Sequence, residues 1–186
     1  MLVLASSSPR RQELLHNAGI EFVVHPANLP EIPHDGELPR SFAERMAREK
    51  ALAVFAIRPN DLVLGADTVV VVNGQILGKP RDAADAARML RMLSGRKHEV
   101  ITGVCLAGPE PKTENCKSET TLVVMNALSD DDIRSYVATG EPMDKAGAYA
   151  IQGMASRWIS RIEGDYFNVV GLPVALVWRM LKEAQG

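Results

Sequence analysis

The stretch that decides the fold is LVLGADTVVVVNGQIL, residues 62–77 of a chain of 186. Its run of valine and leucine is typical of a buried strand. Asn73-Gly74 is the dipeptide that most strongly favours a two-residue hairpin turn, so residues 75–77 are expected to return as a second strand. Strands joined by a hairpin are antiparallel, and the sheet is therefore not expected to be purely parallel.

Strands and helices are intermixed on both sides of this hairpin. Apolar residues at three- and four-residue spacing predict a helix at 40–57, and Ser129 with Asp132 three residues later predicts a capped helix start. Residues 28–39 hold three prolines and a glycine and are expected to form a loop. We therefore predict an α/β fold with a mixed, twisted sheet flanked by helices. The other expected elements are strands at 2–5, 21–25, 99–106, 120–125 and 158–162, a long connection at 108–117, and helices at 9–18, 82–93 and 171–184.

Charge and composition argue against some classes of protein. The formal net charge is −2, so no basic field attracts nucleic acid, and aromatic residues for base stacking make up only 5%. The longest apolar runs reach about ten residues, short of the roughly 20 that a membrane-spanning helix needs. No targeting segment is recognisable at the N-terminus, which favours the cytoplasm. Cys105 and Cys116 are accordingly expected to be reduced thiols.

The turn SSSPRR, residues 6–11, separates the first expected strand from the first expected helix. Ser8 suits the N-cap, and Pro9 suits the first helical position. A helix N-terminus that also carries hydroxyl and guanidinium groups is a good site for phosphate oxygens. The alternative is a capped surface helix with two solvated arginines. The turn is a candidate phosphate site that needs support from elsewhere in the chain.

Asp67 stands inside the apolar run of the central strand. An aspartate is costly to bury unless it has a partner or a task, so Asp67 is a candidate catalytic residue. Gly65 and Ala66 before it would leave room for a ligand to approach. The alternative is a hydrogen-bonded strand aspartate without a chemical role.

Other candidates are weaker when taken singly. Glu31 in the proline-rich loop, Lys50 on the second helix and Lys79 after the hairpin could each be an ordinary solvated residue. Gln152 lies in a segment of small residues at 141–153, which could be a connecting loop; its amide could also read a base edge, because it both donates and accepts. Zinc-ligand spacing and a GxSxG motif are both absent from the sequence. What remains is acids and cations, the groups of metal-assisted phosphoryl or nucleotidyl hydrolysis.

Taken together, these segments resemble the Maf family of septum-formation inhibitor-like proteins, and within it the dTTP/UTP pyrophosphatases. The resemblance covers essentially the whole chain. Each motif is short, but their order and spacing are highly specific. The motifs are LASSSPRR at 4–11, AREKA at 47–51, GADT at 65–68, GKP at 78–80, LSG at 93–95, TGV at 102–104, the segment at 144–153 and NVVGLP at 168–173.

The resemblance implies a cytoplasmic enzyme, frequently dimeric, that cleaves a nucleoside triphosphate between the α and β phosphates with the help of Mg²⁺ or Mn²⁺. It also implies a single domain over residues 1–186, elongated, with two lobes around a central cleft and a fold similar to that of inosine triphosphate pyrophosphatases. Asp67 matches the family's proton acceptor. Arg10, Thr68 and Gln152 match residues that mark the dTTP/UTP subgroup rather than the one acting on 7-methyl-GTP.

One departure concerns Glu31. Relatives usually carry two adjacent acids in the loop after the second strand, where this chain has Pro30-Glu31-Ile32. Glu31 is therefore expected to be a metal ligand together with Asp67, or the second acid of the site.

The expected mechanism gives each group a role. Asp67, helped by metal, would deprotonate a water that attacks the α-phosphorus. Arg11, Lys50 and Lys79 would neutralise charge on the leaving pyrophosphate, while Arg10 would select the substrate. Ser6 and Ser8 would cradle the phosphate chain. The alternative is a non-enzymatic nucleotide-binding regulator of septum formation. That alternative would not explain an inward-facing acid at Asp67.

Overall fold

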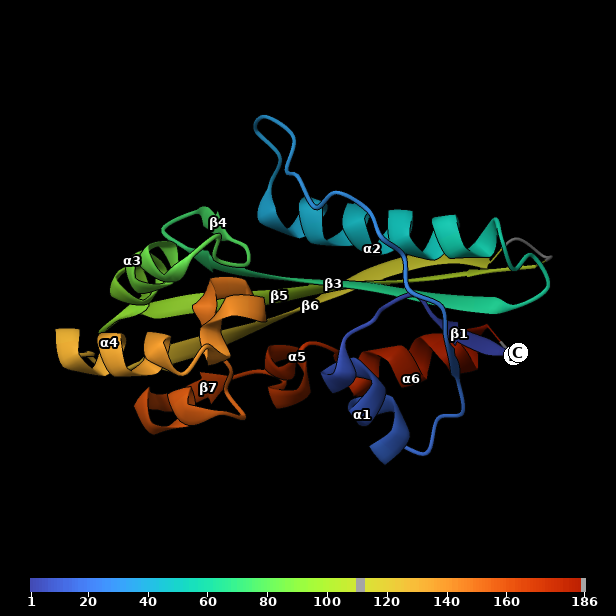
Figure 1. Cartoon of the computed structure of the whole chain (residues 1–186). Coiled ribbons are helices and arrows are strands. Elements are labelled where there is room, and N and C mark those ends of the chain that lie inside the picture. The colour runs from blue at the N-terminus through green and yellow to red at the C-terminus, as the bar shows by residue number, and fades with distance from the viewer. Residues whose placement is uncertain (110–112, 185–186) are drawn as a thin grey trace. The chain divides into compact units, whose positions relative to one another are not determined.

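The computed structural model describes residues 1–109 and 113–184 (Figure 1). Within them, a seven-stranded sheet has the order β2-β1-β3-β5-β6-β7, with β4 paired to β3. β1 runs parallel to β2 and β3, whereas β4 is antiparallel to β3, so the predicted mixed sheet is confirmed. The strands are β1 (Leu2–Leu4), β2 (Val23–Val24), β3 (Leu62–Val72), β4 (Gln75–Leu77), β5 (Lys97–Gly108), β6 (Thr113–Met125) and β7 (Ile159–Glu163).

Helices account for most of the remaining chain. The predicted helices are present, and Ser129 and Asp132 form the predicted capping box. The closing helix begins at Val174, later than expected, because Gly171 to Pro173 are not helical. The helices are α1 (Pro9–Asn17), α2 (Pro39–Phe55), α3 (Ala83–Leu93), α4 (Asp130–Ala138), α5 (Tyr166–Val170) and α6 (Val174–Glu183), with 3₁₀ turns η1 (Glu141–Asp144), η2 (Ala146–Ala148) and η3 (Met154–Trp158). No helix among the described residues is long and apolar enough to span a membrane.

The chain forms two compact units. Unit 1 comprises residues 1–68, 102–119 and 171–186, and unit 2 comprises residues 69–101 and 120–170. Each has an apolar core of its own. The core of unit 1 includes Val3, Val54, Val63 and Ala107, and that of unit 2 includes Val70, Leu90, Met125, Tyr136 and Trp158.

In unit 1, α2 lies along the strands (Figure 1). The two approach closely at glycines, which have no side chain. A Cβ on Gly65 would lie 2.1 Å from the backbone oxygen of Ala47, and one on Gly103 would lie 2.2 Å from that of Ala43. The expectation that Gly65 leaves room for a ligand is therefore wrong, because α2 occupies that space. This close contact holds Lys50 of α2 over Asp67 of β3.

In unit 2, the predicted hairpin between β3 and β4 is confirmed. Asn73 and Gly74 have φ values of 51° and 75°, as the predicted turn requires. The chain after β4 is hydrogen-bonded to the segment before η3, since Gly147 N donates to Gly78 O at 3.0 Å. Gly147 itself has a φ of 69°, and a Cβ there would meet Val70 at 2.9 Å, so only glycine suits this position.

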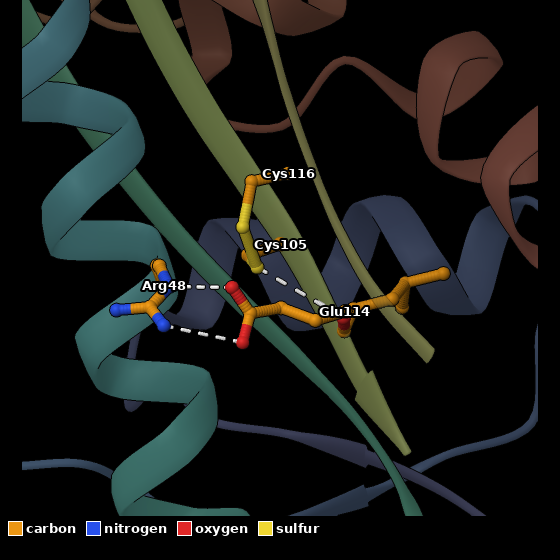
Figure 2. The surroundings of a disulfide bond; sticks show 5 residues. Arg48, Cys105, Glu114 and Cys116 are labelled. Carbon is orange, nitrogen blue, oxygen red and sulfur yellow. Dashed lines mark hydrogen bonds and ion pairs between the residues drawn. A yellow bond between two sulfur atoms is a disulfide. The ribbon is translucent and has the colours of Figure 1, made fainter. Parts of the chain in front are cut away.

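The β5–β6 hairpin differs from the expectation. β6 begins at Thr113, well inside the polar stretch at 108–117 that we expected to connect the strands, whereas β5 ends at Gly108, where that stretch begins. Residues 110–112 of the stretch lie outside the described part of the chain. The longer β6 brings Cys116 next to Cys105, and the two form a disulfide (Figure 2). The expectation of two reduced thiols is thus wrong for this structure. The signal was missed because the polar residues of 113–119 hid a strand that pairs with an apolar one.

Candidate nucleotide site

The opening turn joins β1 to α1. Ser8 occupies the N-cap position and Pro9 the first helical position, as predicted. The side chain of Ser8 makes no capping hydrogen bond, however. Its backbone N instead donates to Ser6 Oγ at 3.3 Å, so the two serines shape the turn before the helix begins.

Arg11 is buried and fastens this turn to two other segments. Its Nε donates to Gly171 O at 2.8 Å, and its Nη1 donates to Ala66 O at 2.9 Å and to Ser6 Oγ at 3.1 Å. Its Nη2 donates to Thr68 Oγ1 at 3.1 Å. Burial lowers the pKa of Arg11, and the negative charges of nearby acids oppose that shift. The guanidinium is thus committed to protein acceptors, and its contact with phosphate stays a prediction.

Thr68 belongs to the same polar cluster. Its Oγ1 lies 2.9 Å from Thr102 Oγ1 and also donates to Gly171 O at 3.3 Å. The hydroxyl is therefore held between three segments that are far apart in the sequence. Any group that contacts Thr68 meets a side chain with one fixed orientation.

Lys50 lies between two carboxylates. Its Nζ is 2.6 Å from Asp67 Oδ1 and 2.6 Å from Glu31 Oε1. The side chains of Lys50 and Asp67 are each 7% exposed, whereas that of Glu31 is 37% exposed. The structure thus brings together three of the predicted catalytic residues, from a loop, a helix and a strand, and one edge of the cluster faces solvent.

Asp67 sits in an environment that disfavours its charge. Burial raises the pKa of Asp67 above its ordinary value, and the positive charges of Lys50 and Arg11 pull it back. A carboxylate with a raised pKa is a better proton acceptor than an exposed one. These are the properties expected of a general base rather than of a strand residue with only a structural role.

Arg45 of α2 anchors the loop that carries Glu31. Its Nε and Nη2 donate to the two carboxylate oxygens of Glu37 at 2.7 and 2.8 Å, and Nη2 also donates to Ile32 O at 3.0 Å. The guanidinium lowers the pKa of Glu37 to about 2, so the pair stays charged at neutral pH. The residue next to Glu31 is therefore tied to the same helix that presents Lys50.

Three predicted site residues remain. Arg10 lies in the first turn of α1 and is half-buried. Lys79 and Gln152 belong to unit 2. Both are exposed. Lys79 follows Gly78, whose carbonyl accepts the hydrogen bond from Gly147, so the lysine turn and the segment at 144–153 are joined. The segment at 141–153 is not a plain connecting loop, since it contains the two short 3₁₀ turns η1 and η2.

The family resemblance implies a divalent metal ion, so the carboxylates near Asp67 can be examined as its possible ligands. Among the described residues no group of three or more His, Cys, Asp and Glu side chains could hold a metal ion. Glu31 and Asp67 nevertheless converge on one point, now held by the ammonium of Lys50. One or two carboxylates together with substrate phosphates are the usual ligands of Mg²⁺, so the residues fit such an ion when a nucleotide accompanies it.

Several residues of the site escaped the sequence reasoning. Thr102 and Gly171 were noted only as parts of short motifs, and Arg45 resembled any other helix-surface arginine. Tyr136 was missed as well, although its hydroxyl donates to Glu141 Oε1 at 2.7 Å. Of these residues, only Glu141 could have been suspected from the sequence, because it is the first residue of the segment that contains Gln152.

Comparison with known proteins identifies the family of this chain. The Maf family profile, described as Maf-like protein, matches residues 1–184. The chain belongs to the Maf family. It is 60% identical over 183 residues to the dTTP/UTP pyrophosphatase of Koribacter versatilis, covering 98% of this chain and 94% of that one. It is 55% identical to the dTTP/UTP pyrophosphatase of Geobacter sulfurreducens, covering 95% and 92%.

Among solved structures, the nucleoside-triphosphatase / dITP/XTP pyrophosphatase of Mycobacterium abscessus aligns with a TM-score of 0.46 at 16% identity. The alignment covers 68% of this chain and 75% of that one.

Proposed function

We propose that this chain is a nucleoside triphosphate pyrophosphatase that hydrolyses dTTP and UTP to the monophosphate and pyrophosphate. The observation that carries the proposal is the position of Lys50 Nζ between Asp67 and Glu31. The first turn of α1, a helix N-terminus suited to phosphate, is bonded to the same strand, because Arg11 donates to Ala66 O. Relatives at 60% and 55% identity bear the name dTTP/UTP pyrophosphatase.

Asp67 accepts a proton from the water that attacks the α-phosphorus. The new bond joins that water oxygen to phosphorus, and the bond to the bridging oxygen breaks, so that pyrophosphate leaves with the electron pair. Lys50 keeps Asp67 ionised and lies ready to offset negative charge that builds up on the phosphates. Ser6, Ser8 and Arg10 bind the phosphate chain, and Arg11 holds the turn that presents them.

Mg²⁺ or Mn²⁺ would be held by Glu31 and Asp67 together with phosphate oxygens. When bound, such an ion polarises the phosphate oxygens and lowers the pKa of a bound water. Glu31 suits this task because its loop is anchored while its carboxylate remains partly exposed.

Lys79 and Gln152 complete the proposal. Lys79 neutralises charge on the leaving pyrophosphate, and Gln152, with Thr68, favours a pyrimidine base. The family resemblance supports the role of Gln152 and Thr68. The proposed enzyme acts in the cytoplasm as a homodimer and removes unwanted nucleotides from the pool.

Asp67→Asn tests the central role. The amide cannot accept the proton, so we expect kcat to fall by about 10²–10⁴-fold while nucleotide affinity changes little. Asp61→Asn is the matched control. Among the described residues, Asp61 pairs with Arg58 and the N-terminal amine and with none of the predicted site residues, so the variant should keep normal turnover. Near-normal turnover of Asp67→Asn would show the assignment of the base to be wrong.

Pyrophosphate release from dTTP, UTP and 7-methyl-GTP tests the substrate class. Faster release from the two pyrimidine nucleotides supports the proposal. A preference for 7-methyl-GTP would move the chain to the other subgroup, and binding without release of pyrophosphate would favour a regulator.

A further inference from the structure

Gln152 lies midway between two backbone amides that one pair of side chains holds. Tyr136 Oη accepts a hydrogen bond from Ala150 N at 3.2 Å and donates one to Glu141 Oε1 at 2.7 Å. The two carboxylate oxygens of Glu141 accept from Met154 N at 3.2 and 3.3 Å. The pair therefore binds the chain two residues before and two residues after Gln152.

The turn between these two amides is closed tightly. Gly153 N donates to Ala150 O at 3.1 Å, which makes residues 150–153 a hydrogen-bonded turn. A Cβ on Gly153 would lie 2.1 Å from Glu141 Oε1, so the carboxylate lies against the backbone next to Gln152. Only glycine permits this approach.

The pair is itself rigidly placed. Tyr136 belongs to α4, is fully buried and meets Trp158 edge-on with ring centroids 5.4 Å apart. Glu141 opens η1 and is half-buried. Burial and the neighbouring carboxylate raise the pKa of Tyr136, so its hydroxyl stays protonated and continues to donate. Hydrogen bonds to a charged carboxylate are stronger than those between neutral groups, which suits a fixed turn.

We propose that Tyr136 and Glu141 are positioning residues that fix the turn carrying Gln152 and thereby set base selectivity. The proposal rests on the proposed function, in which the amide of Gln152 reads the pyrimidine. An amide presents a donor and an acceptor in one plane, and a small change in its direction weakens both bonds to the base. Neither positioning residue needs to touch the nucleotide.

Tyr136→Phe removes the hydroxyl and keeps the buried ring. We expect KM for UTP to rise about tenfold with kcat within about threefold of normal, and the ratio of kcat/KM for UTP to that for GTP to fall about tenfold. Glu141→Ala should change KM and selectivity in the same way. Glu141→Gln keeps the oxygen that accepts from both Tyr136 Oη and Met154 N, and should stay within about threefold of the unmodified protein.

The double variant with Gln152→Ala separates positioning from general stability. If Tyr136 acts through Gln152, Tyr136→Phe should cost no further selectivity once Gln152 is replaced. Equal losses in both backgrounds, or a fall in kcat that is the same for every nucleotide, would overturn the proposal. So would an unchanged selectivity of Gln152→Ala, since no base contact would then depend on the turn.

UTP and GTP affinities measured by calorimetry give the same comparison without turnover. An unmodified protein that prefers UTP in binding, and loses this preference in Tyr136→Phe, supports the positioning role even if no pyrophosphate is released. Absence of release with that result would overturn the proposed function alone.

Discussion

His98 is a buried residue whose ionisation the fold opposes. It is 2% exposed, its Nε2 lies 2.7 Å from Tyr149 Oη, and its Nδ1 has no hydrogen-bond partner among the described residues. Burial lowers the pKa of His98 to about 4, from the 6.5 of a free imidazole. In the unfolded chain His98 therefore binds a proton below about pH 6.5, whereas in the folded chain it binds one only below about pH 4.

Stability should consequently fall on acidification through this window. The free energy of unfolding should drop by on the order of 3 kcal/mol between pH 6.5 and pH 4, with full stability retained above pH 6.5. Urea denaturation at several pH values measures the slope. His98→Gln lacks the ionisable ring and should lose most of it; an equally steep fall in that variant would exclude His98 as the cause.

Gly65 illustrates how one residue decides the position of an element. A methyl group there would meet backbone atoms of α2, which can move aside only if the whole helix shifts. We expect Gly65→Ala to destabilise the protein by about 3 kcal/mol or more. Gly78→Ala is the control, because its added Cβ would meet nothing within 4 Å. Thermal unfolding compares the two, and equal melting temperatures would contradict the close packing.

At the scale of elements, Arg45 links α2 to the loop that carries Glu31. Its contacts with Glu37 and Ile32 disappear in Arg45→Ala, and the loop loses its anchor. If Glu31 is a metal ligand, kcat/KM should fall roughly tenfold and more Mg²⁺ should be needed for half-maximal rate.

Arg48→Ala is the matched control for this test. Arg48 lies on the same helix, but it pairs with Glu114 through exposed groups (Figure 2). Such surface pairs contribute little. Kinetics of the two variants at several Mg²⁺ concentrations make the comparison, and equal losses would show that the loop anchor has no special role.

Regular elements could be predicted well, whereas their contacts could not. The apolar period of 40–57 and the Asn73-Gly74 turn act locally, so pattern alone located α2 and the β3–β4 hairpin. Arg11 contacts Gly171, 160 positions away, and no local pattern encodes such a pairing. The β5–β6 strands were cut short for a related reason, because polar residues of β6 become strand only by pairing with β5.

At the scale of the whole molecule, the Cys105–Cys116 disulfide should contribute to the stability of the folded chain. It closes a short loop, with a sequence separation of 11, and its loss should cost at most about 3 kcal/mol. Thermal unfolding of the whole chain with and without a dithiol reductant should therefore show a melting temperature lower by several degrees when reduced.

Cys116→Ser supplies the control for the reductant. The variant should melt at the temperature of the reduced protein and should not respond to reductant. A shift as large in the variant as in the unmodified protein would show that the reductant acts elsewhere. Thiol titration of freshly purified protein then tells which redox state the cell maintains.

Asp67, Glu31 and Lys50 can be singled out one by one in the sequence, and the family resemblance pairs Glu31 with Asp67, but the position of Lys50 between the two acids was not predicted. Asp67 was conspicuous because an acid in an apolar strand is costly. Glu31 and Lys50 looked like surface residues, since a loop acid and a helix lysine are common. Only the close packing of α2 on β3 brings the lysine between the two acids.

This arrangement has a practical consequence for preparing the protein. Two carboxylates that share a site normally repel one another, and many proteins need a bound cation to fold around such a pair. Here the ammonium of Lys50 already fills that place, so we expect the chain to fold without an added ion. Dialysis against a chelator should leave the circular dichroism spectrum and the melting temperature unchanged. The metal-free protein obtained in this way can then be titrated with one metal at a time.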